Sequence, residues 1–303
     1  MTEERISKHF ILCGGASGQQ MFGFDTHRLQ LGKKTDGEQV RLDVRAISEK
    51  MVQDIPAVMR DLLEIATYVY VADQVVCRGG EKEFEYAEKW HRVFIMKIPV
   101  REYDTWSHEE VREQLEQTLG FVSGDSYTFQ FVPRRIEPPE YLDVEEPDDT
   151  EYRIKDVVLC SGGLDSFTGI VEEVVEHKNS IATVSHWSNP KAKNLQKSLT
   201  DYVKSIQSDE VTCQAIQIRV NKKKELTHEK SQRSRSFLFA ALGTVIAYMY
   251  DLRKVKFYEN GIVTCHLPFD CQTPQARRTR STHPLFLKKM GALVSMLIDS
   301  DFS

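Results

Sequence analysis

VVLCSGGLDS, residues 157–166, is the stretch of this 303-residue sequence that decides the fold. Its first four residues predict a short buried strand, and apolar spacing predicts a helix over residues 167–177, directly after its last residue. Gly162 and Gly163 allow the backbone to turn tightly and to approach a ligand closely. The stretch therefore predicts a strand, a glycine-rich turn and the start of a helix in succession.

The groups in this turn are suited to binding an oxyanion. Ser161 and Ser166 offer hydroxyl donors, and the start of the helix offers free N–H groups at the positive end of its dipole. The turn has no lysine, unlike a Walker-type loop. It therefore suits binding of the pyrophosphate that leaves when a nucleotide is attacked at its α-phosphorus. Asp165 could hold a water molecule or Mg²⁺ on those phosphates. A purely structural turn is the alternative interpretation.

Strands and helices alternate through the second half of the chain. We expect strands at residues 157–160, 180–184, 211–220 and 255–258, and helices at residues 167–177, 190–206, 236–250 and 285–298. The helix at 190–206 is expected to bury Leu195, Leu199, Val203 and Ile206. The alternation predicts an α/β fold with a parallel sheet covered by helices on both faces. Ligands of such sheets bind at the carboxyl ends of the strands.

The first half predicts a smaller α+β domain. We expect strands at residues 10–13, 40–44, 93–99 and 127–132, and helices at residues 55–72 and 107–119. Ser107 and Glu110 have the spacing of a capping box for the second helix. The glycine-rich residues 13–18 are interpreted as a plain turn, with an anion cradle as the alternative.

An acidic, proline-rich stretch separates the two halves. Residues 137–151 contain eight carboxylates, three prolines and no basic residue, whereas the whole chain has a net charge of −5. Like charges and prolines resist compaction, so we predict a solvated linker between domains at residues 1–136 and 152–303. The alternative is an acidic docking strip for a basic partner. Because the acidity is local, the net charge does not argue against anionic ligands.

Composition excludes several classes of protein. With 41% hydrophobic and 28% charged residues, the chain is neither disordered nor collagen-like. It contains no apolar run of about 20 residues, so we expect no membrane span. The amino-terminal residues have no apolar core of a secretory signal, which predicts a cytoplasmic protein. Six cysteines in 303 residues are too sparse for a disulfide scaffold, and because they form no C-x-x-C pair, no zinc ribbon is expected.

SGGLDS in this context resembles the PP-loop of the adenine-nucleotide α-hydrolase-like ATP pyrophosphatases. The resemblance implies a five-stranded parallel α/β sheet that binds ATP and Mg²⁺, splits ATP between the α and β phosphates and adenylates an oxygen of the substrate. It assigns catalysis to Ser161, Asp165 and Arg235, and Mg²⁺ binding to Asp165. It assigns nucleotide binding to Ser161, Gly162, Gly163, Leu164, Asp165, Ser166, Val184, Arg233 and Arg235.

The arginines come from a second resemblance. Residues 232–242, QRSRSFLFAAL, resemble the helix start of the 7-cyano-7-deazaguanine synthases, where basic residues face the ATP phosphates. Arg233 and Arg235 occupy this start, and solvation of the helix end is the alternative interpretation. The expected substrate-binding residues follow the fourth strand or lie in the basic stretch 275–284: Glu259, Asn260, Gly261, Arg278, Arg280 and His283. A solvated loop and a nucleic-acid patch are the alternatives for that stretch.

The whole arrangement is most similar to the diverged synthase-like proteins of anti-phage defence operons, which occur in Qat systems and in type IV CBASS. This resemblance implies ATP-dependent adenylation of a 7-deazaguanine carboxylate. Amide formation with an amine follows, and the expected amine is the N-terminus of a partner protein from the same operon. One alternative is a free synthase of the nitrile or amide that uses ammonia, and another is an ATP-binding scaffold subunit without turnover. A tRNA-modifying enzyme is less expected, because no catalytic cysteine pair or basic tRNA-binding domain is evident.

The chain departs from the biosynthetic synthases in its cysteines. Those enzymes carry a carboxy-terminal cluster of zinc-binding cysteines, which this sequence lacks up to Ser303. We expect the sequence to stop before such a cluster, and Zn²⁺ is expected only if one follows. Cys265 and Cys271 are interpreted as ordinary loop cysteines.

Overall fold

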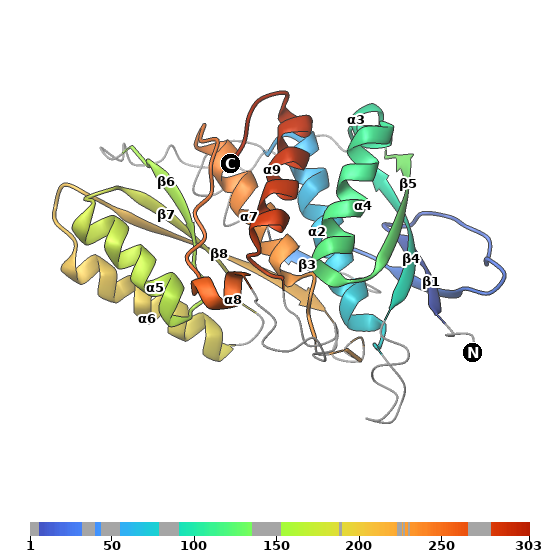
Figure 1. The fold of residues 1–303 in the computed structure, drawn as a ribbon, viewed down its shortest axis with the longest axis horizontal. Helices are drawn as coiled ribbons and strands as arrows, with labels where there is room; N and C mark the ends of the chain where they lie inside the picture. Colours follow the sequence, from blue (N-terminus) through green and yellow to red (C-terminus); the bar gives the residue numbers. More distant parts are fainter. Residues whose placement is uncertain are drawn as a thin grey trace.

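The computed structural model describes residues 6–31, 40–43, 55–78, 91–134, 153–187, 190–222, 226, 228–229, 231–265 and 280–303. In these residues the fold is mixed α/β, with two four-stranded sheets and helices packed against them (Figure 1). The strand orders are β2-β1-β4-β5 and β3-β8-β7-β6. The expected α/β class is therefore confirmed. The acidic stretch at 137–151 lies outside the described residues.

The first sheet is parallel throughout, so the prediction of an α+β arrangement for the first half is wrong. It contains β1 (Ser7–Cys13), β2 (Asp25–Leu29), β4 (Arg92–Val100) and β5 (Ser126–Pro133). Helix α2 (Ala57–Val75) precedes β4, and helices α3 (Tyr103–Ser107) and α4 (Glu109–Ser123) connect β4 to β5. The helical crossover from β4 to β5 returns the chain to the end of the sheet at which β4 begins, which makes these two strands parallel.

The predicted capping box is also wrong. Ser107 ends the short helix α3, and its Oγ donates a hydrogen bond to the carbonyl oxygen of Asp104 at 3.3 Å. Helix α4 begins after His108, whose side chain makes no capping bond. The interruption separates Ser107 from the free N–H groups that it was expected to cap.

The second sheet has the parallel order expected from the alternation of strands and helices. β6 (Asp156–Leu159), β7 (Ile181–His186) and β8 (Cys213–Lys222) are parallel, and β3 (Val40–Asp43) is antiparallel to β8. The predicted fourth strand is reduced to one parallel bridge between Val158 and Lys256. β6 therefore lies between β7 and Lys256, so the direction in which strands are added reverses at β6. Ligand sites of open α/β sheets lie at the carboxyl ends of strands at such a reversal.

The helices of the second half lie close to the predicted positions, except for the short helix α8, which was not predicted. They are α5 (Leu164–Val171) with a π-helical turn, η2 (Glu172–Glu176), then α6 (Pro190–Ile206), α7 (Arg235–Met249), α8 (Gly261–Cys265) and α9 (Pro284–Ile298). α7 is buried along most of its length, as its uniformly apolar sequence predicts. No helix in the described ranges combines the length and apolarity needed to cross a bilayer.

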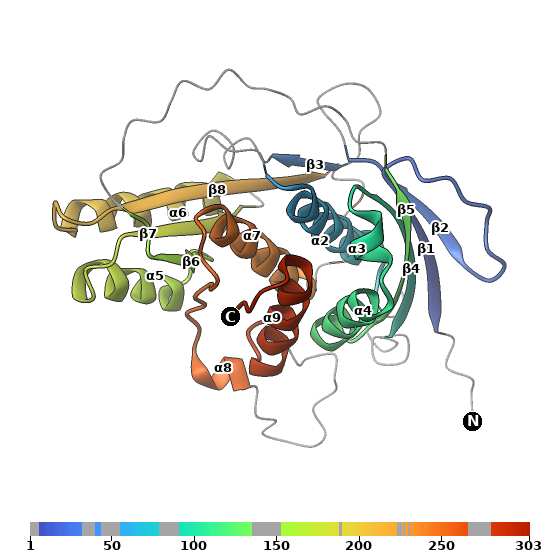
Figure 2. The same ribbon diagram turned by 90° about the horizontal axis from the view of Figure 1, so that it is seen from above.

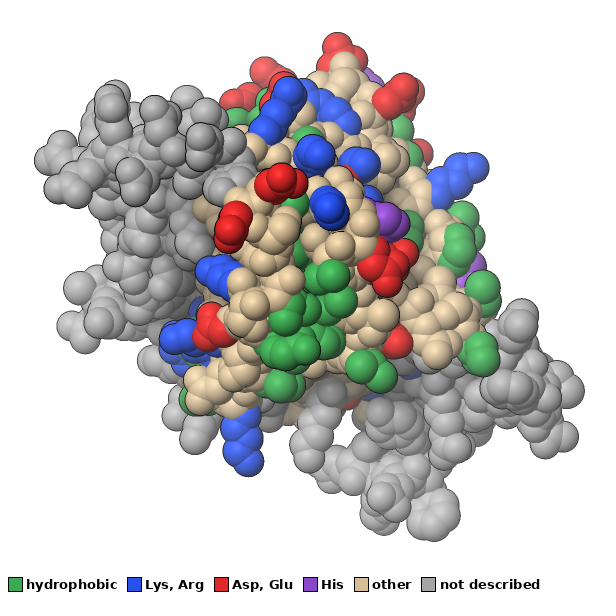
Figure 3. Space-filling view, turned by 90° about the vertical axis from the view of Figure 1, so that its left-hand side faces the viewer, with side chains coloured by type: hydrophobic (Ala, Val, Ile, Leu, Met, Phe, Trp, Pro, Cys, Tyr) green, Lys and Arg blue, Asp and Glu red, His purple; other side chains and the backbone are tan. Residues whose placement is uncertain are grey.

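The face that α6 buries differs from the prediction. Gln196, Thr200 and Val203 are buried, whereas Leu195 is 51% exposed and Ile206 is 39% exposed. Gln196 is drawn inward because its amide donates hydrogen bonds to backbone carbonyls, which apolar spacing cannot reveal. Figure 3 shows hydrophobic side chains gathered on the face at the left of Figure 1, the side of the molecule on which α5 and α6 lie.

The two halves share one hydrophobic core. Figure 2 shows α2, α4, α7 and α9 between the two sheets, where α2 packs on α7 and α4 packs on α9. Leu62 and Phe94 of the first half and Leu242 and Phe286 of the second are all fully buried in this core. Strand β3 adds to the contact, because it comes from the first half and pairs with β8 of the second. Helices of the first half therefore lie close to the carboxyl ends of the second sheet.

Candidate functional site

The turn after β6 has the conformation that its glycines predicted. Gly162 has a φ of +87°, and a β-carbon there would lie 3.3 Å from Cγ of Gln196, so both the backbone and the space favour glycine. Gly163 is extended and directly precedes α5. The side-chain amide of Gln196 donates to the carbonyl oxygen of His186 at 3.2 Å and to that of Ser161 at 3.5 Å. This fixes the turn against the end of β7.

The two serine hydroxyls meet at the start of α5. Ser161 Oγ and Ser166 Oγ are 3.1 Å apart. The N–H of Gly163 donates to Ser161 Oγ at 3.2 Å, and Ser166 Oγ donates to the carbonyl oxygen of Gly163 at 3.0 Å. The turn thus gathers hydroxyl groups beside the N-terminus of a helix, where an anion is favoured.

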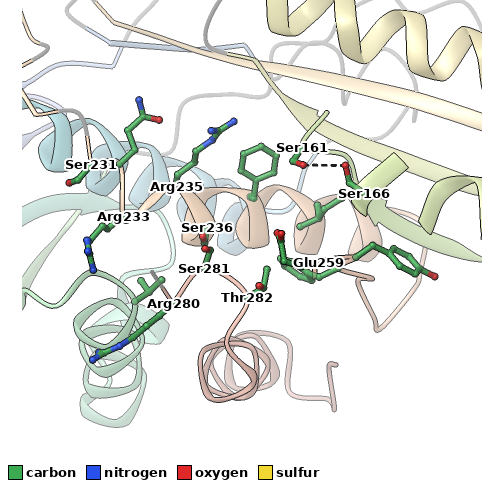
Figure 4. Close-up of a pocket in the computed structure, with 16 residues that line it drawn as sticks. Ser161, Ser166, Ser231, Arg233, Arg235, Ser236, Glu259, Arg280, Ser281 and Thr282 are labelled. Carbon is green, nitrogen blue, oxygen red and sulfur yellow. Dashed lines mark hydrogen bonds between the residues drawn. The ribbon is translucent and has the colours of Figure 1, made fainter. Parts of the chain in front are cut away.

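A pocket of about 480 Å³ opens in front of this turn (Figure 4). Its walls come from the turn itself, the start of α7, the segment after Lys256, the start of α9 and the end of α4. The lining residues are Val122, Leu159, Ser161, Ser166, Ser231, Gln232, Arg233, Arg235, Ser236, Phe239, Phe257, Tyr258, Glu259, Arg280, Ser281 and Thr282. The N-termini of α5, α7 and α9 all border the pocket, and each adds positive potential.

Three arginines predicted from the sequence line this pocket. In the view of Figure 4, Arg233 and Arg280 lie on the side opposite Ser161 and Ser166. The guanidinium of Arg235 lies over the ring of Phe239, 5.2 Å from its centroid. Arg280 lies 4.8 Å from the centroid of Phe121, and its Nη1 donates to the carbonyl oxygen of that residue at 2.8 Å. Arg235 and Arg280 are therefore held by their neighbours, and together with Arg233 they line a volume suited to a polyanion.

The carboxylate of Glu259 lines the same pocket, and that of Asp165 lies near Glu259. Burial, and secondly the negative charge of Asp165, raise the pKa of Glu259 above its usual value. Asp165 is exposed on the first turn of α5. A search of the described ranges for three or more His, Cys, Asp or Glu side chains arranged around a metal found none. Two carboxylates suit Mg²⁺ only where phosphate oxygens and water complete its coordination.

Other predicted residues lie away from the pocket wall. Val184 is fully buried in β7, and Leu164 is 77% exposed on α5. Asn260 accepts a hydrogen bond from the N–H of Ile262 at 2.9 Å, and a β-carbon on Gly261 would meet no atom within 4 Å. No neighbouring atom therefore requires glycine at position 261 in the described part of the chain.

His283 caps α9, and its Nδ1 accepts a hydrogen bond from the N–H of Leu285 at 3.1 Å. Its ring also packs edge-on against Phe121. His283 thus holds the segment that carries Arg280 and does not line the pocket. Arg278 lies outside the described residues, as does Cys271.

Several residues of the pocket were not predicted from the sequence, and Tyr258 is the clearest of them. Its hydroxyl donates to Glu173, which also accepts from Lys256 Nζ at 2.6 Å and from Asn179 Nδ2 at 2.9 Å. Burial would raise the pKa of Glu173, but these hydrogen bonds outweigh it and lower the pKa to about 2. Glu173 lies in the π-helical turn η2, and π-bulges occur often at functional sites. No sequence signal marked this turn.

Val122 of α4 was missed for a different reason. It belongs to the first half of the chain and reaches the pocket only because α4 packs against α9. Ser231, Gln232 and Ser236 adjoin the predicted arginines, so their proximity to the start of α7 was the available signal. Comparison of the chain with models of known families, with curated proteins and with solved structures finds no match.

Proposed function

We propose that the pocket binds ATP and that the protein is an AMP- and pyrophosphate-forming ligase of the PP-loop class. One observation carries the proposal: the Ser161–Ser166 hydroxyl pair and the side chains of Arg233, Arg235 and Arg280 line a single cavity. These residues come from three separate segments, each at the N-terminus of a helix. Among the described residues, this cavity is lined by three arginines and by Glu259 as its only carboxylate, and such a surplus of positive charge suits a polyphosphate.

Each residue has a role in this proposal. Ser161, Ser166 and the free N–H groups of α5 hold the pyrophosphate portion of ATP, while Arg233 and Arg235 balance the charge that develops on it. Arg280 lies across the pocket from the serines and is placed to bind the carboxylate of the second substrate. Asp165 and Glu259 are the residues that would hold Mg²⁺, which would neutralise phosphate charge when bound.

The proposed reaction has two steps. An oxygen of the substrate carboxylate attacks the α-phosphorus of ATP, the bond to the β-phosphate oxygen breaks, and pyrophosphate leaves. An amine then attacks the carbonyl carbon of the acyl-adenylate, AMP leaves with the bonding electron pair, and the amine nitrogen loses a proton. We propose a 7-deazaguanine carboxylate as the acid because residues 157–166 and 232–242 resemble the 7-cyano-7-deazaguanine synthases. The proposed amine is the N-terminus of a protein partner from an anti-phage defence operon.

The test measures AMP and pyrophosphate after incubation with MgATP, 7-carboxy-7-deazaguanine and proteins encoded beside this chain. We expect equal amounts of the two products, and an increase in the partner's intact mass equal to the acid less one water. Asp165→Asn and Ser161→Ala should each abolish AMP release, whereas Glu176→Gln, on an exposed position of η2, should not. Release of AMP while every partner stays unmodified would exclude the conjugation step.

Two other outcomes would assign a different function. Amide or nitrile formed from ammonia without a partner would identify a free synthase. Tight ATP binding without AMP release under any of these conditions would identify a scaffold subunit that binds ATP without turnover.

A further inference from the structure

We infer that Asp73 is a positioning residue for the pocket, acting from the first half of the chain on the arginines at the start of α7. This inference rests on the proposed binding of ATP in the pocket. Asp73 lies near the end of α2 and is fully buried. Its Oδ2 accepts hydrogen bonds from the N–H of Ser234 at 3.0 Å and from Ser234 Oγ at 2.9 Å. Ser234 lies between Arg233 and Arg235, both of which line the pocket.

The bond replaces the normal cap of α7. Ser234 is the residue before the helix; its side chain makes no capping bond to an N–H group of α7, and its hydroxyl donates to Asp73. The carboxylate of Asp73 is thus held at the N-terminus of α7, where a negative charge is favoured. The direction in which Arg233 and Arg235 leave the backbone therefore depends on α2.

A neutral cluster of four charges holds Asp73 in this position. Its Oδ1 accepts from Arg78 Nη2 at 3.0 Å and from Arg92 Nη2 at 2.5 Å, and the side chains of all three are fully buried. Asp125 accepts hydrogen bonds from the same two arginines. Burial would raise the pKa of Asp73, but Arg92 and Arg78 outweigh it and hold the pKa well below its usual range. Two arginines balance two aspartates, so the cluster adds no net charge beside the pocket.

The preceding residues are also attached to the first half. The N–H groups of His228 and Glu229 donate to the carbonyl oxygen of Gln74 at 2.9 and 3.0 Å. Glu229 in turn accepts from the N–H of Arg78 at 2.6 Å and from the N–H of Ser231 at 2.8 Å. Gln232 has a φ of +45°, which is unusual for a residue other than glycine and requires support from its surroundings. The turn that carries the arginines therefore takes its shape from α2 and Arg78.

Asp125 provides a matched control for Asp73. Both aspartates are buried and bond the same arginines, but in the described part of the chain only Asp73 bonds Ser234. We expect Asp73→Asn to weaken binding of ATP and of inorganic pyrophosphate about tenfold more than Asp125→Asn does. Ser234→Ala, which removes one hydrogen bond and no buried charge, should weaken binding in the same direction with little loss of stability.

A double-mutant cycle tests whether Asp73 acts through the arginine. If it does, Asp73→Asn should weaken pyrophosphate binding much less in an Arg235→Gln background than in the parent. The result that overturns the inference is equal binding by Asp73→Asn and Asp125→Asn, or full additivity of Asp73→Asn with Arg235→Gln. If the aspartate variants do not fold, Ser234→Ala decides: binding equal to that of the parent overturns the inference.

Hydrogen exchange separates this inference from the proposed function. In Asp73→Asn, the amide of Ser234 and those of the following helical turn should exchange faster than in Asp125→Asn, without any nucleotide present. A parent protein that binds neither ATP nor pyrophosphate would contradict the proposed function, while this exchange difference would still support the role of Asp73 in holding the turn. The same exchange in both variants would overturn that role, whatever the parent binds.

Discussion

The ring of Tyr258 lies directly against the Cα of Gly169, so that a β-carbon at Gly169 would be only 2.0 Å from Cγ of the ring. Gly169 is buried in α5, and Tyr258 lines the pocket. Contacts this short cannot exist, and the ring would have to move. Tyr258 can therefore occupy its place in the pocket wall only because residue 169 of α5 is a glycine.

The first prediction concerns this contact between Gly169 and Tyr258. Gly169→Ala should displace Tyr258, break its hydrogen bond to Glu173 and weaken ATP binding, although alanine normally favours a helix. Isothermal titration with ATP and denaturant unfolding measure the two effects. Gly261→Ala is the control, because a β-carbon there would meet no atom within 4 Å. Unchanged affinity and stability in Gly169→Ala would show that the ring is not held as described.

The second prediction concerns the turn after β6. Gly162→Ala should destabilise the protein by about 1–3 kcal/mol, because φ is +87° and the new methyl group would crowd Gln196. Gly163→Ala should cost less, since Gly163 is extended and its nearest neighbour would be Ser161 Oγ at 3.4 Å. Urea unfolding measures both variants. Equal destabilisation by the two substitutions would contradict the assignment of the strained position to Gly162.

The third prediction is a loss of stability in mild acid that comes from His186. Burial, and secondly the positive charge of Arg235, lower the pKa of His186 to about 4 from the usual value of 6.5. Because the unfolded chain binds the proton more tightly, the stabilisation is complete above pH 6.5 and is lost as the pH falls through 4. The loss for this residue reaches at most roughly 3 kcal/mol.

Urea midpoints at pH 7 and pH 5 measure this effect. His186→Phe should reduce the change in stability between the two values, and the remainder should include His9, whose burial also lowers its pKa to about 4. His108→Gln is the control, since His108 is exposed. A His186→Phe variant with the same pH dependence as the parent would rule out His186 as a source of the loss.

The fourth prediction concerns Mg²⁺ and Glu259. Without Mg²⁺, Glu259→Gln should bind pyrophosphate more tightly by roughly threefold, because a negative charge is removed from the pocket wall. With Mg²⁺ the gain should vanish or reverse, since a carboxylate that helps hold the ion has been lost. Glu176→Gln serves as the control on the exposed surface of η2. A gain of the same size with and without Mg²⁺ would exclude Glu259 from the ion's surroundings.

Local features of the fold were predictable from the sequence, whereas pairings between distant segments were not. The 3.6-residue spacing predicted α2 as a helix, and its observed limits are Ala57–Val75. β3 was predicted as a strand, but its pairing with β8 joins residues about 180 positions apart, and alternation of apolar residues does not identify a partner. The parallel order of the first sheet was missed for the same reason.

The residues of the pocket also fall into those that the sequence predicted and those that it did not. Ser161, Ser166, Arg233, Arg235, Glu259 and Arg280 were predicted from motifs and all line it. Val122, Tyr258 and the supporting Asp73 were not predicted, because each acts through a neighbour that is distant in sequence. Asp73 and Ser234 are 161 residues apart, and nothing local to either residue indicates their hydrogen bond.

The sequence by itself determined the strand, glycine turn and helix at residues 157–166, because φ at Gly162 and the periodicity around it are local properties. It also determined the alternation that makes β6, β7 and β8 parallel. Only the tertiary structure decided that Val122 of α4 lines the pocket and that Asp73 of α2 bonds Ser234 beside it. Such contacts depend on how two buried faces pack together, and the free energy of that packing belongs to the whole core rather than to any one segment.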